Sequence, residues 1–532
     1  MPAYDYQLLL KHVLTQGVAW APNQEIIYRD QVRHNYTTMY QRVLRLGAAL
    51  QALGVRQGTK VGVIEWDSHR YLEMYFGIPG IGAVLHTINP RLAPEDLAYT
   101  MAHAEDEVLI FHEDFWPLVE RLRPRLPCIN KYVLISDKGE KPDIKGVDAE
   151  YEELLAGVIP LAELPDLDEG TLATMSYTTG TTGQPKGVYF TQRQLTLHSM
   201  SGATTLSALG NYGGINKKDV YMPLTPMFHV HAWGMPYVAT LFGLKQVYPG
   251  KYEAPMLMKL ILGEKVTFSH CVPTILQMIT GAPGIDKFDL SRWKVVIGGA
   301  RLPKGLALDA TRLGIKVYAG YGMSETCPVL TIANLKPYME EWDQEKQLDY
   351  AIKTGFTVPL VNLKVVNAAG AEVAHDGRET GEIVVRAPWC TAGYYKEPER
   401  SEELWAGGWM HTGDVAYVDE HGFVQIVDRL KDVIKSGGEW IVSLELENLL
   451  SLHEGVQEVA VIGMPDEKWG ETGLMIVVLK TMDACTPDDL LDFCRERLAG
   501  YKVPKQVILT GELPYSPYGK VMKAELKEKF IG

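Results

Sequence analysis

The sequence contains few cysteines, and none of them stands as part of a pair. No Cys-x-x-Cys unit and no closely spaced Cys/His set occurs among the 532 residues. Zinc sites built on such spacings, and disulfide frameworks, are therefore not indicated. Single cysteines are typical of a reducing compartment, and we expect a cytoplasmic protein. The six are Cys128, Cys271, Cys327, Cys390, Cys485 and Cys494.

Three further features are missing. An excess of positive charge is missing, since Lys and Arg total 52 against 66 Asp and Glu, which gives a net charge of −14. A nucleic-acid binder needs a basic surface, so nucleic-acid binding is not predicted. The residues after Met1 show no basic stretch followed by an apolar one, so no signal peptide is predicted. No apolar run reaches the roughly 18 residues of a membrane span, so no transmembrane segment is predicted. Any phosphate chemistry must therefore use a few local cations.

What the sequence does show is the alternation of an α/β protein. Apolar, β-branched runs at residues 61–66, 108–111 and 132–135 predict buried strands, with helical segments between them. Such alternation predicts a parallel sheet covered by helices. Residues 6–53 are expected to be largely helical.

The texture changes in the C-terminal third of the chain. After about residue 354, short strands and turns replace the long alternation, and a charged neck follows at residues 428–432. A chain of this length is expected to form more than one domain. We therefore predict a boundary at the neck, with domains at 1–429 and 430–532.

The most informative segment runs from Tyr177 to Gly187, with the sequence Tyr-Thr-Thr-Gly-Thr-Thr-Gly-Gln-Pro-Lys-Gly. Glycines let backbone N–H groups approach phosphate oxygens, threonines add donors, and Lys186 adds a mobile charge. The segment is not the common P-loop, because no Gly-Lys-Ser/Thr follows at the required spacing. Strands are expected on both sides, so a plain β-hairpin is the alternative to a polyphosphate-binding loop.

A second motif, Tyr-Ala-Gly-Tyr-Gly-Met-Ser-Glu-Thr at residues 318–326, follows another predicted strand. The glycines beside Tyr321 would let its ring pack flat against a base, and Glu325 offers a hard oxygen ligand for Mg²⁺. A nucleophile elbow is not predicted, because Thr326 stands where its second glycine would be. A β-turn with a buried tyrosine is the alternative.

Three shorter motifs follow. Asp414 ends a glycine-containing turn, where it could bind a ribose diol or act as a turn residue. Residues 428–440 combine three cations, a glycine pair and apolar residues such as Trp440, which argues against a plain solvated charge run. Lys520 lies in a Gly/Pro loop, and taken alone it would be read as a surface lysine.

The five motifs, in this order and spacing, resemble the acyl-adenylate-forming superfamily of acyl-CoA synthetases, peptide-synthetase adenylation domains and firefly luciferase. The resemblance covers nearly the whole chain. Trp66, residues 82–92 and residues 226–233 look like the medium- and long-chain fatty acyl-CoA synthetase branch. Ser324 stands where threonine is more usual, which keeps the hydroxyl.

The resemblance implies a fold and a reaction. The fold is α/β, with a large N-terminal adenylate-forming domain of stacked β-sheets and helices, a small β-barrel subdomain, and a small mobile C-terminal α+β domain that turns about a hinge near Lys431. The reaction is ATP-dependent activation of a carboxylic acid to acyl-adenylate and pyrophosphate, followed by transfer to coenzyme A with release of AMP. The expected substrate is a medium- to long-chain fatty acid.

The resemblance also assigns roles to individual residues. Thr178, Thr181, Thr182 and the catalytic Lys186 would handle the β- and γ-phosphates, and the catalytic Glu325 with Thr178 would hold Mg²⁺. The remaining ATP- and AMP-binding set is Val230, Gly299, Gly320, Tyr321, Ser324, Asp414, Arg429, Lys431 and Trp440. Of these, Asp414 and Arg429 would grip the ribose. Lys520 would bridge the substrate carboxylate and the α-phosphate.

For the other two substrates, the resemblance implies separate sites. Trp233 would gate the acyl tunnel, which Val230, Gly234, Met235 and Gly298 would line. Coenzyme A would meet the catalytic Lys435 together with Gly437 and Gly438. A homodimer is expected by analogy only.

Other readings of the same residues stay open. The acid could be a short thioether acid such as methylmercaptopropionate, or an aryl or alicyclic acid. The acceptor could be a carrier protein in place of coenzyme A. An oxygenase of the luciferase type and a non-enzymatic nucleotide-binding scaffold are less favoured, the latter because Lys186, Lys435 and Lys520 all occupy motif positions.

Overall fold

The computed structural model describes residues 4–138, 146–178, 184–209, 213–436, 439–481, 484–515 and 521–531. The chain forms two compact units. The first unit comprises residues 1–362 and 386–410, and the second comprises residues 363–385 and 411–532. Residues 411–429 therefore pack with the second unit, although they precede the predicted boundary. The position of the hinge near Lys431 stays a prediction.

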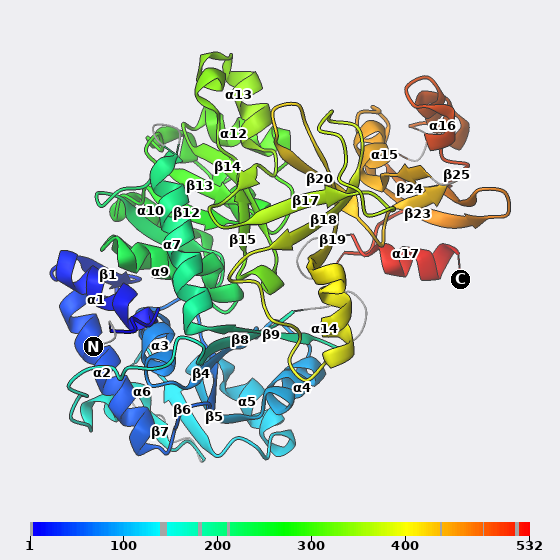
Figure 1. Ribbon diagram of the computed structural model, residues 1–532. Coiled ribbons are helices and arrows are strands. Elements are labelled where there is room, and N and C mark those ends of the chain that lie inside the picture. Colours follow the sequence, from blue (N-terminus) through cyan, green and yellow to red (C-terminus); the bar gives the residue numbers. More distant parts are fainter. Residues whose placement is uncertain are drawn as a thin grey trace. The chain divides into compact units, whose positions relative to one another are not determined.

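Two large sheets build the first unit (Figure 1). In the described part of the chain, one sheet has nine strands, parallel in its middle and antiparallel at both ends. In spatial order they are β16 (Phe356–Thr357), β15 (Val329–Ile332), β14 (Lys316–Gly322), β13 (Lys294–Ile297), β12 (Phe268–Cys271), β10 (Val220–Leu224), β11 (Lys245–Tyr248), β1 (Glu25–Tyr28) and β2 (Val32–Asn35).

The other sheet, again counted over the described residues, has seven strands and is parallel except for its last pair. In spatial order they are β7 (Ala149–Glu150), β6 (Lys131–Ile135), β5 (Asp106–His112), β3 (Lys60–Ile64), β4 (Val84–Thr87), β8 (Leu172–Thr178) and β9 (Lys186–Thr191). The strands predicted at 61–66, 108–111 and 132–135 are thus confirmed as β3, β5 and β6, and so is the parallel sheet.

The prediction that residues 6–53 are largely helical is wrong in its middle. Two helices flank a β-hairpin made of β1 and β2. Residues 25–28, Glu-Ile-Ile-Tyr, pair in parallel with β11, more than 200 residues away in the sequence. Two isoleucines suit a strand once such a partner is present, but the partner is not visible locally.

Helices cover the sheets of the first unit. A core of Leu257, Leu276, Val295 and their neighbours lies between the nine-stranded sheet and α10, α11 and α12, and Leu97 and Phe111 belong to a core under α4 and α5. The described helices are α1 (Leu10–Trp20), α2 (Tyr36–Ala52), α3 (His69–Gly80), α4 (Pro94–Ala104), α5 (Trp116–Leu122), α6 (Tyr151–Ala156), α7 (Gln192–Ala208), α9 (Met235–Leu241), α10 (Ala254–Gly263), α11 (Pro273–Thr280), α12 (Lys304–Arg312), α13 (Gln344–Ala351) and α14 (Pro398–Leu404).

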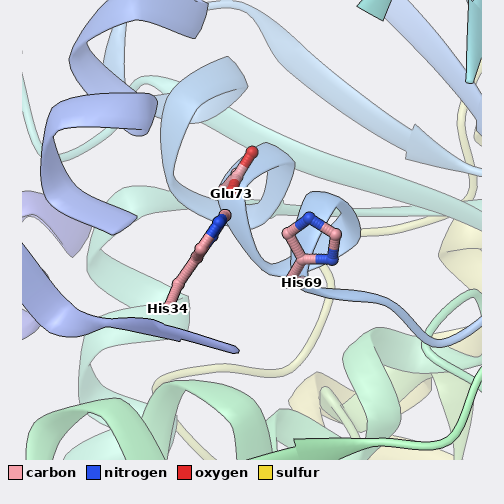
Figure 2. A group of neighbouring side chains, drawn as sticks. All are labelled: His34, His69 and Glu73. Carbon is pink, nitrogen blue, oxygen red and sulfur yellow. The ribbon is translucent and has the colours of Figure 1, made fainter. Parts of the chain in front are cut away.

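Helix α3 is the centre of this unit. It contacts β1 of the nine-stranded sheet and β4 and β8 of the seven-stranded sheet, and each of its twelve residues is buried. Its start is fixed by Ser68, whose side chain accepts a hydrogen bond from the Tyr71 N–H. The helix nevertheless carries charged residues, whose partners Arg42, Asp137 and Glu152 are half-buried. His69 and Glu73 face His34 of β2 (Figure 2).

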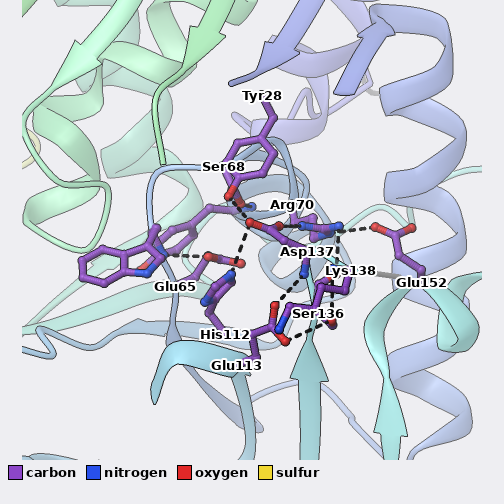
Figure 3. A network of polar contacts seen from close by, with 12 residues as sticks. Tyr28, Glu65, Ser68, Arg70, His112, Glu113, Ser136, Asp137, Lys138 and Glu152 are labelled. Carbon is purple, nitrogen blue, oxygen red and sulfur yellow. Dashed lines mark hydrogen bonds and ion pairs between the residues drawn. The ribbon is translucent and has the colours of Figure 1, made fainter. Parts of the chain in front are cut away.

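A polar network around Asp137 joins α3 to both sheets (Figure 3). We call Tyr28, Arg70, His112, Asp137 and Glu152 the Asp137 network. Asp137 accepts hydrogen bonds from the Tyr28 hydroxyl at 2.8 Å and from Arg70 Nη1 at 2.9 Å, and His112 Nε2 lies 3.5 Å away. Burial would raise the pKa of Asp137, but His112, Tyr28 and Arg70 hold it well below its usual range. Arg70 Nε also donates to Glu152 at 2.7 Å.

The second unit contains two smaller sheets. The short strands predicted after about residue 354 are confirmed in a four-stranded sheet ordered β17 (Asn362–Val366), β18 (Gly381–Arg386), β19 (Met410–Val418), β20 (Val424–Arg429). The second sheet contains β21 (Ile434–Ser436), β22 (Glu439–Ile441), β23 (Val456–Asp466), β24 (Gly470–Leu479) and β25 (Gln506–Leu509). Its helices are α15 (Ser443–Leu450), α16 (Pro487–Arg495) and α17 (Lys523–Phe530).

Of the helices that the structure describes, none combines the length and the hydropathy that crossing a bilayer would require.

Glu65 makes the stability of the first unit depend on pH. Its side chain is fully buried beside the Asp137 network, with Oε1 accepting from the Trp66 N–H at 2.7 Å. Burial raises the pKa of Glu65 from 4.5 to about 7, although His112 and Arg70 act in the other direction. The folded chain therefore holds a proton that the unfolded chain releases, and this stability is lost as the pH rises through about 7.

We expect Glu65→Gln to remove this loss. Between pH 5 and pH 8 the variant should lose about 2–3 kcal/mol less free energy of unfolding than the wild type, because an amide does not ionise. Urea unfolding at the two pH values measures the difference. The matched control is Glu107→Gln on β5, since Glu107 is exposed. Equal pH dependence in the wild type and Glu65→Gln would contradict the assignment.

Candidate active site

The expected phosphate loop connects two antiparallel strands of the first unit. Strand β8 pairs with β9 so that Thr178 lies opposite Lys186 and Tyr177 opposite Gly187. The strands predicted around the motif are confirmed, and they form an antiparallel pair, which the alternative reading as a β-hairpin also requires. A hairpin does not exclude phosphate binding, because it carries Thr178 and Lys186 to the same end of the sheet. Thr181 and Thr182 lie outside the described residues.

Lys186 and Glu325 are brought together by a residue that the motifs did not identify. The Lys186 ammonium lies 4.6 Å from the centroid of the Tyr394 ring, and the Tyr394 hydroxyl donates to Glu325 Oε1 at 2.9 Å. Burial, followed by the charge of Glu325, raises the pKa of Tyr394 above its usual value, so this hydroxyl keeps its proton. The Glu325 carbonyl accepts from the Thr391 N–H at 2.8 Å. Two separate motifs therefore meet at Tyr394.

The signal for Tyr394 in the sequence is weak. It is the first of two adjacent tyrosines, Tyr394 and Tyr395, that follow Gly393 in a loop before α14. Aromatic pairs in loops are common, and only the folded chain shows that this loop returns to β9, where the Tyr395 N–H donates to the Gly187 carbonyl at 2.8 Å. The contact fixes the loop against the strand that carries Lys186.

Four residues of the expected ATP- and AMP-binding set lie at the ends of β13 and β14 or directly after them. Gly299 follows β13 in a left-handed conformation, with φ of 72°, and Gly320 and Tyr321 lie on β14. Ser324 begins the single turn η5 (Ser324–Thr326), which also holds Glu325. The parallel strands thus carry Gly299, Tyr321 and Ser324 to the carboxyl ends of the sheet, which is where ligands bind in open α/β folds.

The residues expected to line the acyl pocket form a tight left-handed turn. Turn η3 (Val230–Gly234) has positive φ at every residue, from 42° at Val230 to 74° at Gly234. A Cβ atom on Gly298 would lie 3.0 Å from the Trp233 ring, so only glycine fits there at this distance. The structure therefore brings Val230, Trp233, Gly234 and Gly298 together, with Met235 as the first residue of α9.

Histidines surround this turn in the uncharged form. The pKa of each of His198, His231 and His270 is lowered to about 3 by burial. The His270 ring centroid lies 5.1 Å from that of Trp233, and a Cβ on Gly234 would meet the His198 ring at 2.7 Å. The turn is therefore lined by neutral rings, as suits an uncharged acyl tail.

The remaining predicted residues belong to the second unit. Asp414 and Arg429 form a cross-strand pair of β19 and β20, with Arg429 Nε 2.8 Å from Asp414 Oδ1. Asp414 is buried and Arg429 is half exposed, so the pair presents a charged edge. Lys435 of β21 lies directly opposite Trp440 of β22. Gly437, Gly438 and Lys520 lie outside the described residues.

Lys431 and Lys523 both take part in the contacts of helix α17 with the rest of this unit. The Lys431 carbonyl is 3.4 Å from Lys527 Nζ of α17. Lys523, the first residue of the same helix, pairs with Glu447 at 2.7 Å and contacts the Ser443 hydroxyl. The Ser443 N–H donates to Asp428 at 2.6 Å, so the charged neck is anchored by hydrogen bonds to α15.

The chain is similar to known CoA ligases along nearly its whole length. A long-chain-fatty-acid–CoA ligase of Thermus thermophilus is 39% identical over 536 residues, covering 99% of this chain and 96% of that protein. A 3-methylmercaptopropionyl-CoA ligase of Ruegeria pomeroyi is 38% identical, covering 93% of this chain and 92% of that protein. The crystal structure of the anthranilate CoA ligase AuaEII in complex with anthranoyl-AMP has a TM-score of 0.81, at 25% identity and 99% coverage of both chains.

The family models cover both units. The model described as AMP-binding enzyme matches residues 14–395, which include β8, β9, Glu325 and Tyr394. The model described as AMP-binding enzyme C-terminal domain matches residues 445–520. With these matches the resemblance predicted from the five motifs is confirmed, and the chain belongs to the AMP-binding enzyme family.

Proposed function

We propose that this chain activates a medium- to long-chain fatty acid with ATP and transfers the acyl group to coenzyme A. The reaction class follows from the family and from relatives named as CoA ligases along nearly the entire chain: it is an AMP-forming acyl-CoA ligase. The observation that carries the proposal is the link from Lys186 through Tyr394 to Glu325, because it joins a phosphate-binding loop to a buried carboxylate.

Adenylation joins two anions, so its main requirement is charge neutralisation at a fixed geometry. In the proposal, Lys186 and the threonines of the loop bind the β- and γ-phosphates. Asp414 would accept hydrogen bonds from the ribose hydroxyls, and Arg429 holds that carboxylate in place through its 2.8 Å contact. Lys520 would contact the substrate carboxylate and the α-phosphate.

The residues around Glu325 fit a Mg²⁺ ion. Mg²⁺ prefers oxygen ligands and usually takes one or two carboxylates together with phosphate oxygens and water. Glu325 is a buried carboxylate whose Oε1 is oriented by Tyr394. Glu325 and Thr178 would hold the ion, which when bound would screen the charge of the departing pyrophosphate.

The preference for an acid with an uncharged tail rests on the apolar turn around Trp233. Neutral surroundings disfavour a second carboxylate on the substrate, since an unpaired buried charge is costly. They do not separate a fatty acid from a short thioether acid, the substrate type named for the Ruegeria relative, or from an aryl acid. A carrier protein is the alternative acceptor to coenzyme A. A cytoplasmic location and a homodimer are proposed by analogy.

The substrate proposal is tested by pyrophosphate release with ATP and Mg²⁺. Acids from acetate to stearate, methylmercaptopropionate and benzoate would each be supplied with and without coenzyme A. We expect the highest kcat/KM for medium or long chains, with thioester formed only when coenzyme A is present. An optimum at methylmercaptopropionate or benzoate would overturn the fatty-acid proposal and keep the reaction. Adenylate without any thioester would instead indicate a carrier protein.

We expect Tyr394→Phe to raise the Mg²⁺ concentration needed for half-maximal pyrophosphate release about tenfold. The substitution removes one hydrogen bond to a charged group, and such bonds contribute about 1.5–3 kcal/mol. The control is Tyr395→Phe, whose ring packs on His103 and Tyr189, outside the Lys186–Glu325 link. An unchanged Mg²⁺ dependence in Tyr394→Phe would show that Tyr394 does not orient Glu325.

Two lysines should separate the half-reactions. Lys520→Ala should slow adenylation about 10²–10³-fold, the usual cost of losing one charged contact in the transition state, and leave thioester formation from supplied acyl-adenylate intact. Lys431→Pro should do the reverse, because a fixed φ removes the freedom of the proposed hinge. Measuring both half-reactions in both variants tests the assignment. Equal losses in both half-reactions would refute it for that lysine.

A further inference from the structure

His34, His69 and Glu73 converge at a place that the proposed ligase reaction does not use. His69 and Glu73 are four residues apart on α3, so they lie on the same face of the helix. His34 reaches them from β2, the last strand of the nine-stranded sheet (Figure 2). One nitrogen or oxygen of each side chain lies within 4.8 Å of those of the other two.

The two imidazoles carry nitrogens without partners. Among the described residues, His34 Nδ1 and His69 Nδ1 are buried and make no hydrogen bond. His69 is only 2% exposed, so water does not compensate it freely. An unpartnered buried polar atom costs about 1–3 kcal/mol, and such atoms are rare in folded proteins. Ring packing is the simplest alternative, since the two rings meet edge to face with centroids 5.3 Å apart. Packing leaves both nitrogens unsatisfied.

Burial disfavours the protonated form of both rings. Burial, and after it the nearby Arg70, lowers the pKa of His69 well below its usual value. Burial and Arg42 lower the pKa of His34 in the same way. A neutral imidazole has one nitrogen with a free lone pair, which is the form that coordinates a metal ion.

Glu73 is held in place by neighbours that leave it able to bind a cation. Arg42 Nε donates to Oε1 at 2.6 Å, Arg42 Nη2 donates to Oε2 at 3.2 Å, and the Tyr151 hydroxyl donates to Oε2 at 2.9 Å. A carboxylate has about four lone-pair positions, so one remains. Ligands oriented by such outer hydrogen bonds are typical of metal sites.

The cations around the cluster are themselves paired with carboxylates, although Arg42 and Arg70 still disfavour additional positive charge at the two rings. Arg42 and Arg70 are the nearby cations, and each is paired: Arg42 with Glu73 and Glu152, and Arg70 with Glu152 and Asp137. Three carboxylates thus face two guanidinium groups. A metal ion would reach the cluster from the side of β2, because His34 is half-buried whereas every residue of α3 is buried.

We propose that His34, His69 and Glu73 bind a divalent transition-metal ion such as Zn²⁺. Two imidazole nitrogens and one carboxylate oxygen are a donor set that Zn²⁺ accepts, with a water in the fourth position. The ion would fasten the edge strand β2 to the central helix α3. It is distinct from the Mg²⁺ of the ligase reaction, which prefers oxygen ligands alone.

The sequence did not indicate this site. Closely spaced cysteines and histidines are the sequence pattern that predicts a zinc site. His34 and His69 do not form such a pattern, because they belong to different elements, β2 and α3. Only the packing of the hairpin β1–β2 against α3 brings the three residues together.

The test is Zn²⁺ binding by the full chain after removal of metals with a chelator. Zn²⁺ would be titrated in competition with a chromophoric indicator, in the presence of excess Mg²⁺, and Co²⁺ would be used as a spectroscopic probe. We expect one tight site per chain, a tetrahedral Co²⁺ spectrum and a Zn²⁺-dependent rise in the thermal midpoint. His34→Gln should weaken Zn²⁺ binding more than about tenfold and abolish the rise.

Two further variants keep the outcome decisive. His69→Asn should lose Zn²⁺ binding like His34→Gln, and both are compared with the wild type by circular dichroism to verify folding. His12→Gln is the matched control, because His12 stacks on Tyr6 away from the cluster. Absence of stoichiometric Zn²⁺ binding by the wild type would overturn the proposal. So would equal Zn²⁺ affinity in the wild type and folded His34→Gln.

Discussion

The structure of the first unit depends on Asp137, a partly buried carboxylate whose partners come from two sheets and the helix between them. Removing a charge from water costs several kcal/mol, which is recovered only if every donor around it is well placed. Tyr28 from one sheet and Arg70 from the helix between the sheets donate hydrogen bonds to Asp137, and His112 Nε2 from the other sheet lies 3.5 Å away. Because the three partners come from three elements, the sheets and α3 cannot shift relative to one another without breaking a contact to Asp137.

Periodicity and residue type predicted much of this fold. The parallel sheet was predictable because its inner strands, such as Val108–Phe111 within β5, are apolar on both faces, as strands covered on both sides must be. The hairpin of β1 and β2 was not predictable, because its stability comes from the pairing of β1 with the distant strand β11. The turn at Trp233 was not predictable either. Its five successive residues with positive φ have no signal in the local sequence, because packing imposes their conformation.

Residues of the candidate site could be predicted from the sequence where they lie within a single motif, and could not be predicted where they lie outside the motifs. Thr178, Lys186, Tyr321 and Glu325 each stand in a motif whose residue types match the chemistry. Tyr394 does not, and its importance lies in a contact with Glu325 across 69 residues of sequence. His34 and His69 are further examples, since a pair of distant histidines has no spacing by which to recognise it. Sequence therefore indicates which chemistry is present, and folding decides which residues support it.

The left-handed turn Val230–Gly234 has an energetic consequence. A left-handed conformation costs roughly 1–2 kcal/mol for each residue that has a Cβ, and four such residues adopt it here in succession. The sum, about 4–8 kcal/mol, is comparable to the net stability of a whole domain. The packing of His198, His270 and Gly298 around the turn must supply it. The left-handed conformation of residues 230–234 therefore depends on this packing, and a substitution that loosens the packing removes what holds the turn in place.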